Sequence, residues 1–222
     1  PEAIVRLLEP GDGAFHAAVA AALSSSTSSG HPAGAGETRE FLIDAARRSL
    51  TVCPVVAAFD SDRLAASAFA LESPGRAALV FTSSPDQVSP WTSALSSVVQ
   101  IAISRRNLLL EMLLQPDDDG RCGLLPATGF RRLTRLNYLR LPVPSHAVNK
   151  PVATPHSWLR YSEKTHAVFV AALRSSYAQS LDCPELTGLR SIDEVLEGHR
   201  AAGEFDPALW QVIHRGNTPL GV

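Results

Sequence analysis

The apolar positions in the first half of the chain follow two periods, and these predict the local structure. Short apolar runs bounded by turn-forming residues predict strands at residues 4–8, 55–59, 64–71 and 77–82. Apolar positions three or four residues apart predict helices with one buried face at residues 13–23, 39–50 and 91–106. The expected order is strand, two helices, a three-stranded antiparallel meander and a long helix, with Asp12 capping the first helix.

The region after the meander predicts a parallel crossover. Residues 108–114, LLLEMLL, are almost continuously apolar, which suits a strand covered on both faces. Together with residues 77–82 and the helix from Trp91, they predict a right-handed strand–helix–strand unit. Ser89 and Pro90 suit an N-cap followed by proline at the first helical position. Backbone amides at such a helix start favour anions, so a ligand is expected at this turn.

The pattern then closes and begins again. A short helix over residues 121–127 with a C-cap at Gly129, and a strand near residues 131–141, complete the first copy. The second copy is predicted from a strand at 158–161, a helix at 164–180, a helix opened by the capping box at 191–194, and strands at 209–214 and from Pro219. The predicted domains are 1–143 and 157–222, joined by a proline-rich linker at 144–156. The fold class is α+β, a mixed and mostly antiparallel sheet with one parallel crossover and a partial second copy.

Composition narrows the classes of function. The 222 residues carry a net charge of −2, which does not indicate a nucleic-acid surface, and no apolar run reaches the length of a membrane span. There is no secretory leader pattern, and the three cysteines lack CxxC spacing, which favours reduced thiols in the cytoplasm. The histidines lack HxxxH or HExxH spacing, and Asp117, Asp118 and Asp119 lack the calcium-loop pattern, so no metal site is expected.

Two segments resemble a known family. The stretch GLLPATGFRRLTRLNYL, residues 123–139, resembles the closing segment of the GNAT acetyltransferase fold. Residues 176–210, from SYAQSLDCPEL to FDPALW, are similar to the opening of the second domain in bacterial tandem GNAT proteins related to mycothiol synthase. The resemblance implies acetyl-coenzyme A as cofactor and a small primary amine as acceptor. It also implies that catalysis belongs to the second domain.

The family's cofactor motif, Q/R-x-x-G-x-G/A, falls on Gln87, Val88, Ser89, Pro90, Trp91 and Thr92. Gln87 fits the motif, but Pro90 and Thr92 replace both glycines that let amides approach a pyrophosphate. This stretch is either a weakened phosphate site with Trp91 stacking on an adenine or a plain capped helix start with Trp91 packed on the sheet. The family's frequent general acid, a tyrosine, falls on Leu125, which has no proton to transfer.

The second half offers a separate set of candidates for amine binding. Tyr177, Asp182, Glu185 and His199 are polar groups in the segment that resembles the tandem proteins, and a carboxylate there would orient an amine or accept its proton. The alternative is that the two acids shape a polar loop around Cys183 and that His199 is structural.

Two classes of function therefore stay open. The chain is part of an N-acetyltransferase, or it is a non-catalytic module for folding, assembly or ligand sensing, with a coenzyme A-binding regulator as a third reading. The second copy stops after about three strands, and the open edge of so short a sheet favours pairing. We expect either that the rest of this copy follows in a longer chain or that a second copy of the chain covers the edge.

Overall fold

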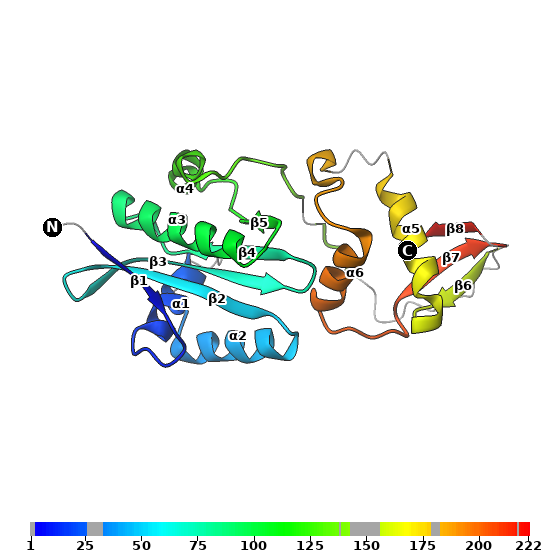
Figure 1. Ribbon diagram of the computed structural model, residues 1–222, viewed down its shortest axis with the longest axis horizontal. Helices are drawn as coiled ribbons and strands as arrows, with labels where there is room; N and C mark the ends of the chain where they lie inside the picture. Colours follow the sequence, from blue (N-terminus) through cyan, green and yellow to red (C-terminus); the bar gives the residue numbers. More distant parts are fainter. Residues whose placement is uncertain (1–2, 26–32, 138, 143–155, 179–182, 217) are drawn as a thin grey trace. The chain divides into compact units, whose positions relative to one another are not determined.

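The computed structural model describes residues 3–25, 33–137, 139–142, 156–178, 183–216 and 218–222 (Figure 1). Its contacts divide the chain into two compact units. Unit 1 combines Pro1–Arg131 with Leu189–Glu204, and unit 2 combines Arg132–Gly188 with Phe205–Val222. Each unit has a sheet of its own. The domain limits drawn from the repeat in the sequence stay a prediction.

The sheet of unit 1 has five strands in the order in which the chain forms them. They are β1 (Ile4–Leu8), β2 (Thr51–Asp60), β3 (Arg63–Ser73), β4 (Ala77–Thr82) and β5 (Leu109–Glu111). Neighbouring strands are antiparallel up to β4, whereas β4 and β5 are parallel, with Ala77 opposite Leu109 and Leu79 opposite Glu111. The predicted meander and the parallel crossover are both confirmed.

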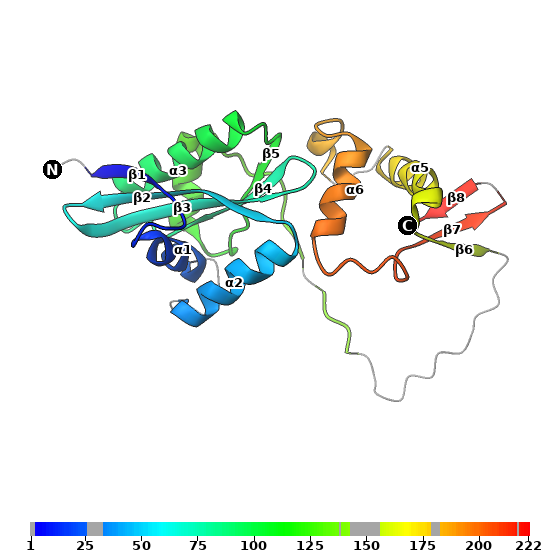
Figure 2. The same cartoon turned by 60° about the horizontal axis from the view of Figure 1, so that its bottom comes forward.

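Helices cover both faces of this sheet, as Figures 1 and 2 show. α1 (Phe15–Ser24) and α2 (Ala35–Arg47) pack on one face with Val55, Phe69 and their neighbours. α3 (Val88–Ser104) packs on the other face with Val56, Val80 and their neighbours. The two clusters take alternate residues of the same strands because successive side chains of a strand point to opposite faces. Unit 1 also contains α4 (Asp119–Leu124), a 3₁₀ turn η1 (Leu125–Thr128) and α6 (Ile192–Ala201).

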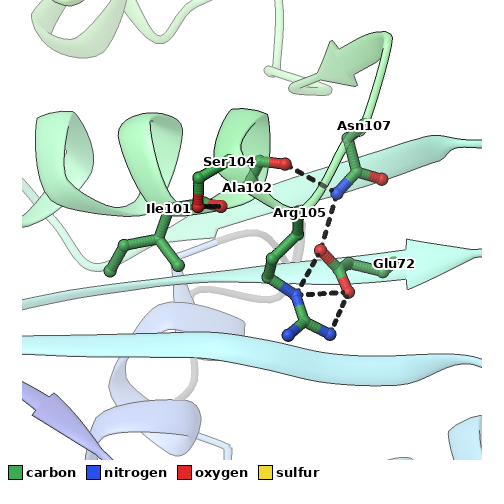
Figure 3. A network of polar contacts seen from close by, with 6 residues as sticks. All are labelled: Glu72, Ile101, Ala102, Ser104, Arg105 and Asn107. Carbon is green, nitrogen blue, oxygen red and sulfur yellow. Dashed lines mark hydrogen bonds and ion pairs between the residues drawn. The ribbon is translucent and has the colours of Figure 1, made fainter.

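The end of the crossover helix is fixed to the sheet by one polar network (Figure 3). Glu72 at the end of β3 accepts two hydrogen bonds from Arg105 Nε at 2.9 Å, one from its Nη2 at 2.8 Å, and one from Asn107 Nδ2 at 2.6 Å. Asn107 also donates to the carbonyl of Ala102. Because Glu72 is largely buried and fully paired, the network fixes where the chain leaves α3 and enters β5.

The N-caps predicted for two helices are wrong. The N-cap of α1 is Ala14 rather than Asp12, whose Oδ2 accepts a hydrogen bond from the Glu9 N–H instead. α3 begins at Val88 with Gln87 as its N-cap, so Pro90 is the third helical residue instead of the first. Proline is tolerated anywhere in the first turn of a helix, because the N–H groups of that turn have no partner within the helix.

The predictions for residues 108–114 and 131–141 are partly wrong. Only Leu109–Glu111 form a strand, and these residues are half-buried because β5 is the edge of the sheet. In residues 131–137 and 139–142, the described part of the second segment, no strand forms, and the Leu139 side chain is 95% exposed. The C-cap at Gly129, with φ of 88°, is confirmed.

Unit 2 repeats the start of unit 1 in strand order. β6 (Ser157–Arg160), β7 (Gln211–Arg215) and β8 (Thr218–Gly221) form an antiparallel sheet in that order. α5 (His166–Tyr177), preceded by the 3₁₀ turn η2 (Glu163–Thr165), packs on this sheet through Phe169 and Ala172 against Val212. A third 3₁₀ turn, η3 (Pro184–Leu186), follows α5. Two helices therefore separate β6 from β7, as α1 and α2 separate β1 from β2.

Candidate functional site

The turn between β4 and α3, residues 83–87, is the position predicted for the cofactor phosphates. Val88 and Ser89 hold the first two helical amides, while Pro90 has none to offer. The Trp91 amide already donates to the Gln87 carbonyl at 3.1 Å. Of the four donors that a helix start normally presents to an anion, those of Gln87, Val88 and Ser89 therefore remain.

Internal hydrogen bonds close the same turn. Trp91 is 1% exposed, and its indole Nε1 donates to the Ser83 carbonyl at 2.9 Å. The ring belongs to the core cluster beneath α3, which leaves no face for an adenine. Ser84 Oγ donates to the Asp86 carboxylate at 3.0 Å. This carboxylate lies just before the helix start, where its charge opposes binding of a phosphate.

The two ends of the predicted motif have different surroundings. Gln87 is half-buried and makes no side-chain bond to the helix that it caps. Thr92 lies in the second turn of α3, where its Oγ1 donates to the Val88 carbonyl at 2.8 Å. Its amide therefore sits within the helical hydrogen-bond pattern and is turned away from any ligand at the helix start.

Arg121 lies buried at the carboxyl end of β4, and sequence reasoning missed it. Pairing between β4 and β5 stops at Leu79, although β4 runs on to Thr82. Arg121 of α4 is 7% exposed and donates to the carbonyls of Thr82 at 3.4 Å and Ser25 at 2.5 Å. Its guanidinium also pairs with the Asp118 carboxylate. The position where ligands bind in open α/β sheets thus holds a side chain of the protein itself.

Leu125, which takes the place of the family's tyrosine, begins η1 and packs against the core cluster beneath α3. It contributes apolar contact and no proton. The Thr82 hydroxyl beside Arg121 is buried without a hydrogen-bond partner among the described residues.

The four candidates of the second half are not brought together in one unit. Tyr177 is the last residue of α5, and Glu185 lies in η3; both belong to unit 2. His199 lies in α6 and belongs to unit 1. Asp182 lies outside the described residues. The predicted amine site therefore stays a prediction.

His199 gives unit 1 a dependence on pH. Burial lowers the pKa of His199 below its ordinary value, and the nearby Arg190 guanidinium lowers it further. Stability from such a group is present above the unfolded pKa of about 6.5 and is lost as the pH falls below it. We expect the thermal midpoint to drop between about pH 7.5 and 5.5, and to drop less in His199→Gln. Scanning fluorimetry of both proteins measures this, and equal drops would contradict it.

Three further features of the described residues bear on function: possible metal ligands, a surface hollow and the character of the helices. Within the described ranges, no three His, Cys, Asp or Glu side chains are grouped as a metal would need, and Asp118 is already paired with Arg121. A hollow of about 320 Å³ beside β1 is lined by Arg6, Asp12, Phe59 and their neighbours, and Arg6 lies 5.3 Å over the Phe59 ring. Among the helices that the structure describes, none combines the length and apolar character of a membrane span.

Comparisons with known proteins give structural matches only. No protein-family model matches the chain, and no curated protein matches it. An N-acetyltransferase from Staphylococcus aureus Mu50 matches at a TM-score of 0.45 and 10% identity, over 59% of this chain and 84% of that one. Glucosamine-6-phosphate N-acetyltransferase from Arabidopsis thaliana matches at 0.44 and 9%, over 64% of this chain and all of that one. A transcriptional regulator from Bacillus halodurans C-125 matches at 0.47 and 8%, over 63% of this chain and all of that one. Enzymes and a regulator are both present, so these matches assign no activity to this chain.

Proposed function

We propose that the chain belongs to a tandem GNAT-type N-acetyltransferase, with unit 1 as its first copy and unit 2 as the start of its second. The observation that carries the proposal is the repeat of sheet order. β6, β7 and β8 follow one another as β1, β2 and β3 do, with two helices between the first and second strands in each case. The resemblance of residues 176–210 to tandem acetyltransferases supports the same reading.

The proposed reaction is a direct transfer. A primary amine loses a proton and attacks the thioester carbonyl of acetyl-coenzyme A, which forms the C–N bond. The C–S bond then breaks, and coenzyme A leaves as a thiolate that takes up a proton. The chemistry needs amides that hold the pyrophosphate and a group that accepts the amine's proton.

Unit 1 supplies neither requirement. Its helix start lacks the donor that Pro90 cannot supply, and Leu125 stands where an acid is expected. Arg121 occupies the carboxyl end of β4, where it donates to the Thr82 carbonyl. We therefore place transfer outside unit 1, in the second copy.

The same observations favour a second candidate, a non-catalytic module. Trp91 and Arg121 satisfy the carbonyls of Ser83 and Thr82 from within, so these two acceptors need no ligand. A protein in which both copies were closed in this way would fold, assemble or sense another ligand without transferring acetyl groups.

Acetyl transfer by the protein with its complete reading frame separates these candidates. The assay measures release of coenzyme A thiol with a panel of primary amines, and Gln87→Ala serves as the variant in unit 1. Amine-dependent release that survives Gln87→Ala supports the tandem enzyme. No amine-dependent release favours the module, and release abolished by Gln87→Ala would overturn the placement of catalysis outside unit 1.

A further inference from the structure

α6 comes late in the chain but is part of unit 1. By chain order it is the second helix after β6, the place that α2 holds after β1. α2 packs on the sheet of its own copy, whereas α6 groups with unit 1. The two copies thus differ in where their second helix is held.

Polar contacts hold α6 at both of its ends. Arg48, which follows α2, donates from Nε and Nη2 to the Ala201 carbonyl at 3.2 and 3.1 Å. Because the carboxyl end of a helix carries partial negative charge, a guanidinium is favoured there. Near the other end, Arg190 donates to the Gly75 carbonyl at 3.2 Å, and Arg76 pairs with Glu194 at 3.4 Å.

The middle of α6 approaches the β3–β4 turn very closely. A Cβ built at Gly75 would lie 1.9 Å from the Glu194 carbonyl oxygen and 3.1 Å from the Gly198 nitrogen. Glycine in a helix interior costs about 1 kcal/mol relative to alanine, yet Gly198 stands in the middle of α6, where the Pro74 carbonyl approaches. The tight backbone contact therefore explains Gly75, whereas a Cβ at Gly198 would lie 3.5 Å from the Pro74 carbonyl oxygen, an ordinary van der Waals distance.

α6 also buries two of its apolar side chains. Leu196 and Ala201 are buried, whereas His199 is exposed. The N-terminus of the helix is closed by its own capping box, in which Ser191 and Glu194 exchange hydrogen bonds. The helix is thus well formed locally, and its docking adds contacts along its length.

We propose that unit 1 serves as an intramolecular scaffold for α6, and that Arg48, Gly75 and Arg76 form the dock that orders this helix for the second copy. This assigns a role to a first copy in which Trp91 and Arg121 donate hydrogen bonds to the carbonyls at the end of β4 and in the turn that follows it. The phrase "second copy" rests on the proposed tandem arrangement, while the docking itself is tested without any acetyl transfer.

The test is hydrogen–deuterium exchange of the full chain, followed by mass spectrometry of peptides over residues 192–201. Gly75→Ala is compared with Gly129→Ala. Both glycines have a φ of 88°, so an alanine is disfavoured by the backbone at either position. A Cβ at Gly129 meets nothing within 4 Å, so only Gly75→Ala pushes against α6. We expect exchange in α6 to rise at least about tenfold in Gly75→Ala relative to Gly129→Ala, with α3 unchanged. Equal exchange of α6 in the two variants would overturn the proposal.

A second pair of variants tests the docking of α6 if Gly75→Ala destabilises all of unit 1. Arg48→Met keeps much of the side-chain stem and removes the donors to Ala201, while Arg47→Met changes an exposed arginine one residue earlier. Faster exchange at the carboxyl end of α6 in Arg48→Met alone supports the dock. Identical exchange in Arg48→Met and Arg47→Met would refute it.

Discussion

We expect the chain to show no micromolar binding of acetyl-coenzyme A in a calorimetric titration. The helix start at Val88 lacks a donor at Pro90, and the Thr92 amide lies within the second turn of α3. Each lost hydrogen bond to a charged phosphate is worth about 1.5–3 kcal/mol. Two such losses weaken binding by about two to four powers of ten. The helix dipole remains and contributes only about 0.3–1 kcal/mol to binding, so the net effect is weaker binding of acetyl-coenzyme A.

Variants of the turn test the cause of this weakness. Pro90→Ala returns one amide without loosening the helix, and Asp86→Asn removes the charge before it. The double variant is expected to bind acetyl-coenzyme A more tightly than the natural sequence. Pro10→Ala, at an exposed proline in another turn, is the control for a change of proline alone. Micromolar binding by the natural sequence would contradict the argument, as would equal gains in the double variant and in Pro10→Ala.

Periodicity was sufficient to predict most of the fold. The strand at residues 77–82 is recovered with the same limits, and Phe15, Ala18, Val19 and Ala22 form the buried stripe expected for α1. These elements follow from local rules, because a buried face repeats every 3.6 residues in a helix and every two in a strand. The capping box at Ser191 is likewise a local signal, and it is confirmed.

The features that decide function depend on contacts distant in sequence. Arg121 lies among aspartates and glycines, a pattern typical of a solvated helix start, yet its guanidinium reaches Ser25, far away in the chain. The need for glycine at residue 75 is evident only when the β3–β4 turn and α6 are seen together. The apolar run at 108–114 suggested burial on both faces, but an edge position left it half-exposed. Local patterns carry no information about which distant carbonyl or helix a side chain will meet.

The largest loss of stability is expected for Trp91→Ala. Trp91 is 1% exposed, packs between α3 and the sheet, and donates its indole N–H to the Ser83 carbonyl. Replacing a buried tryptophan by alanine costs about 3–5 kcal/mol through lost burial and the remaining cavity. Trp158→Ala is the matched control, because this tryptophan is 59% exposed on the edge strand β6 and should change stability by about 0.5 kcal/mol or less.

A third variant separates the hydrogen bond from the packing. Trp91→Phe keeps an aromatic ring in the core but leaves the Ser83 carbonyl without its donor, which costs about 1–3 kcal/mol for a buried acceptor. Hydrogen exchange of α3 amides during denaturant titration measures unit 1 separately from unit 2, so the free energy of opening is read for the unit that carries the change. The expected order of stability is natural sequence, Trp91→Phe, then Trp91→Ala. A loss in Trp158→Ala as large as that in Trp91→Ala would show that the Trp91 ring does not organise this core.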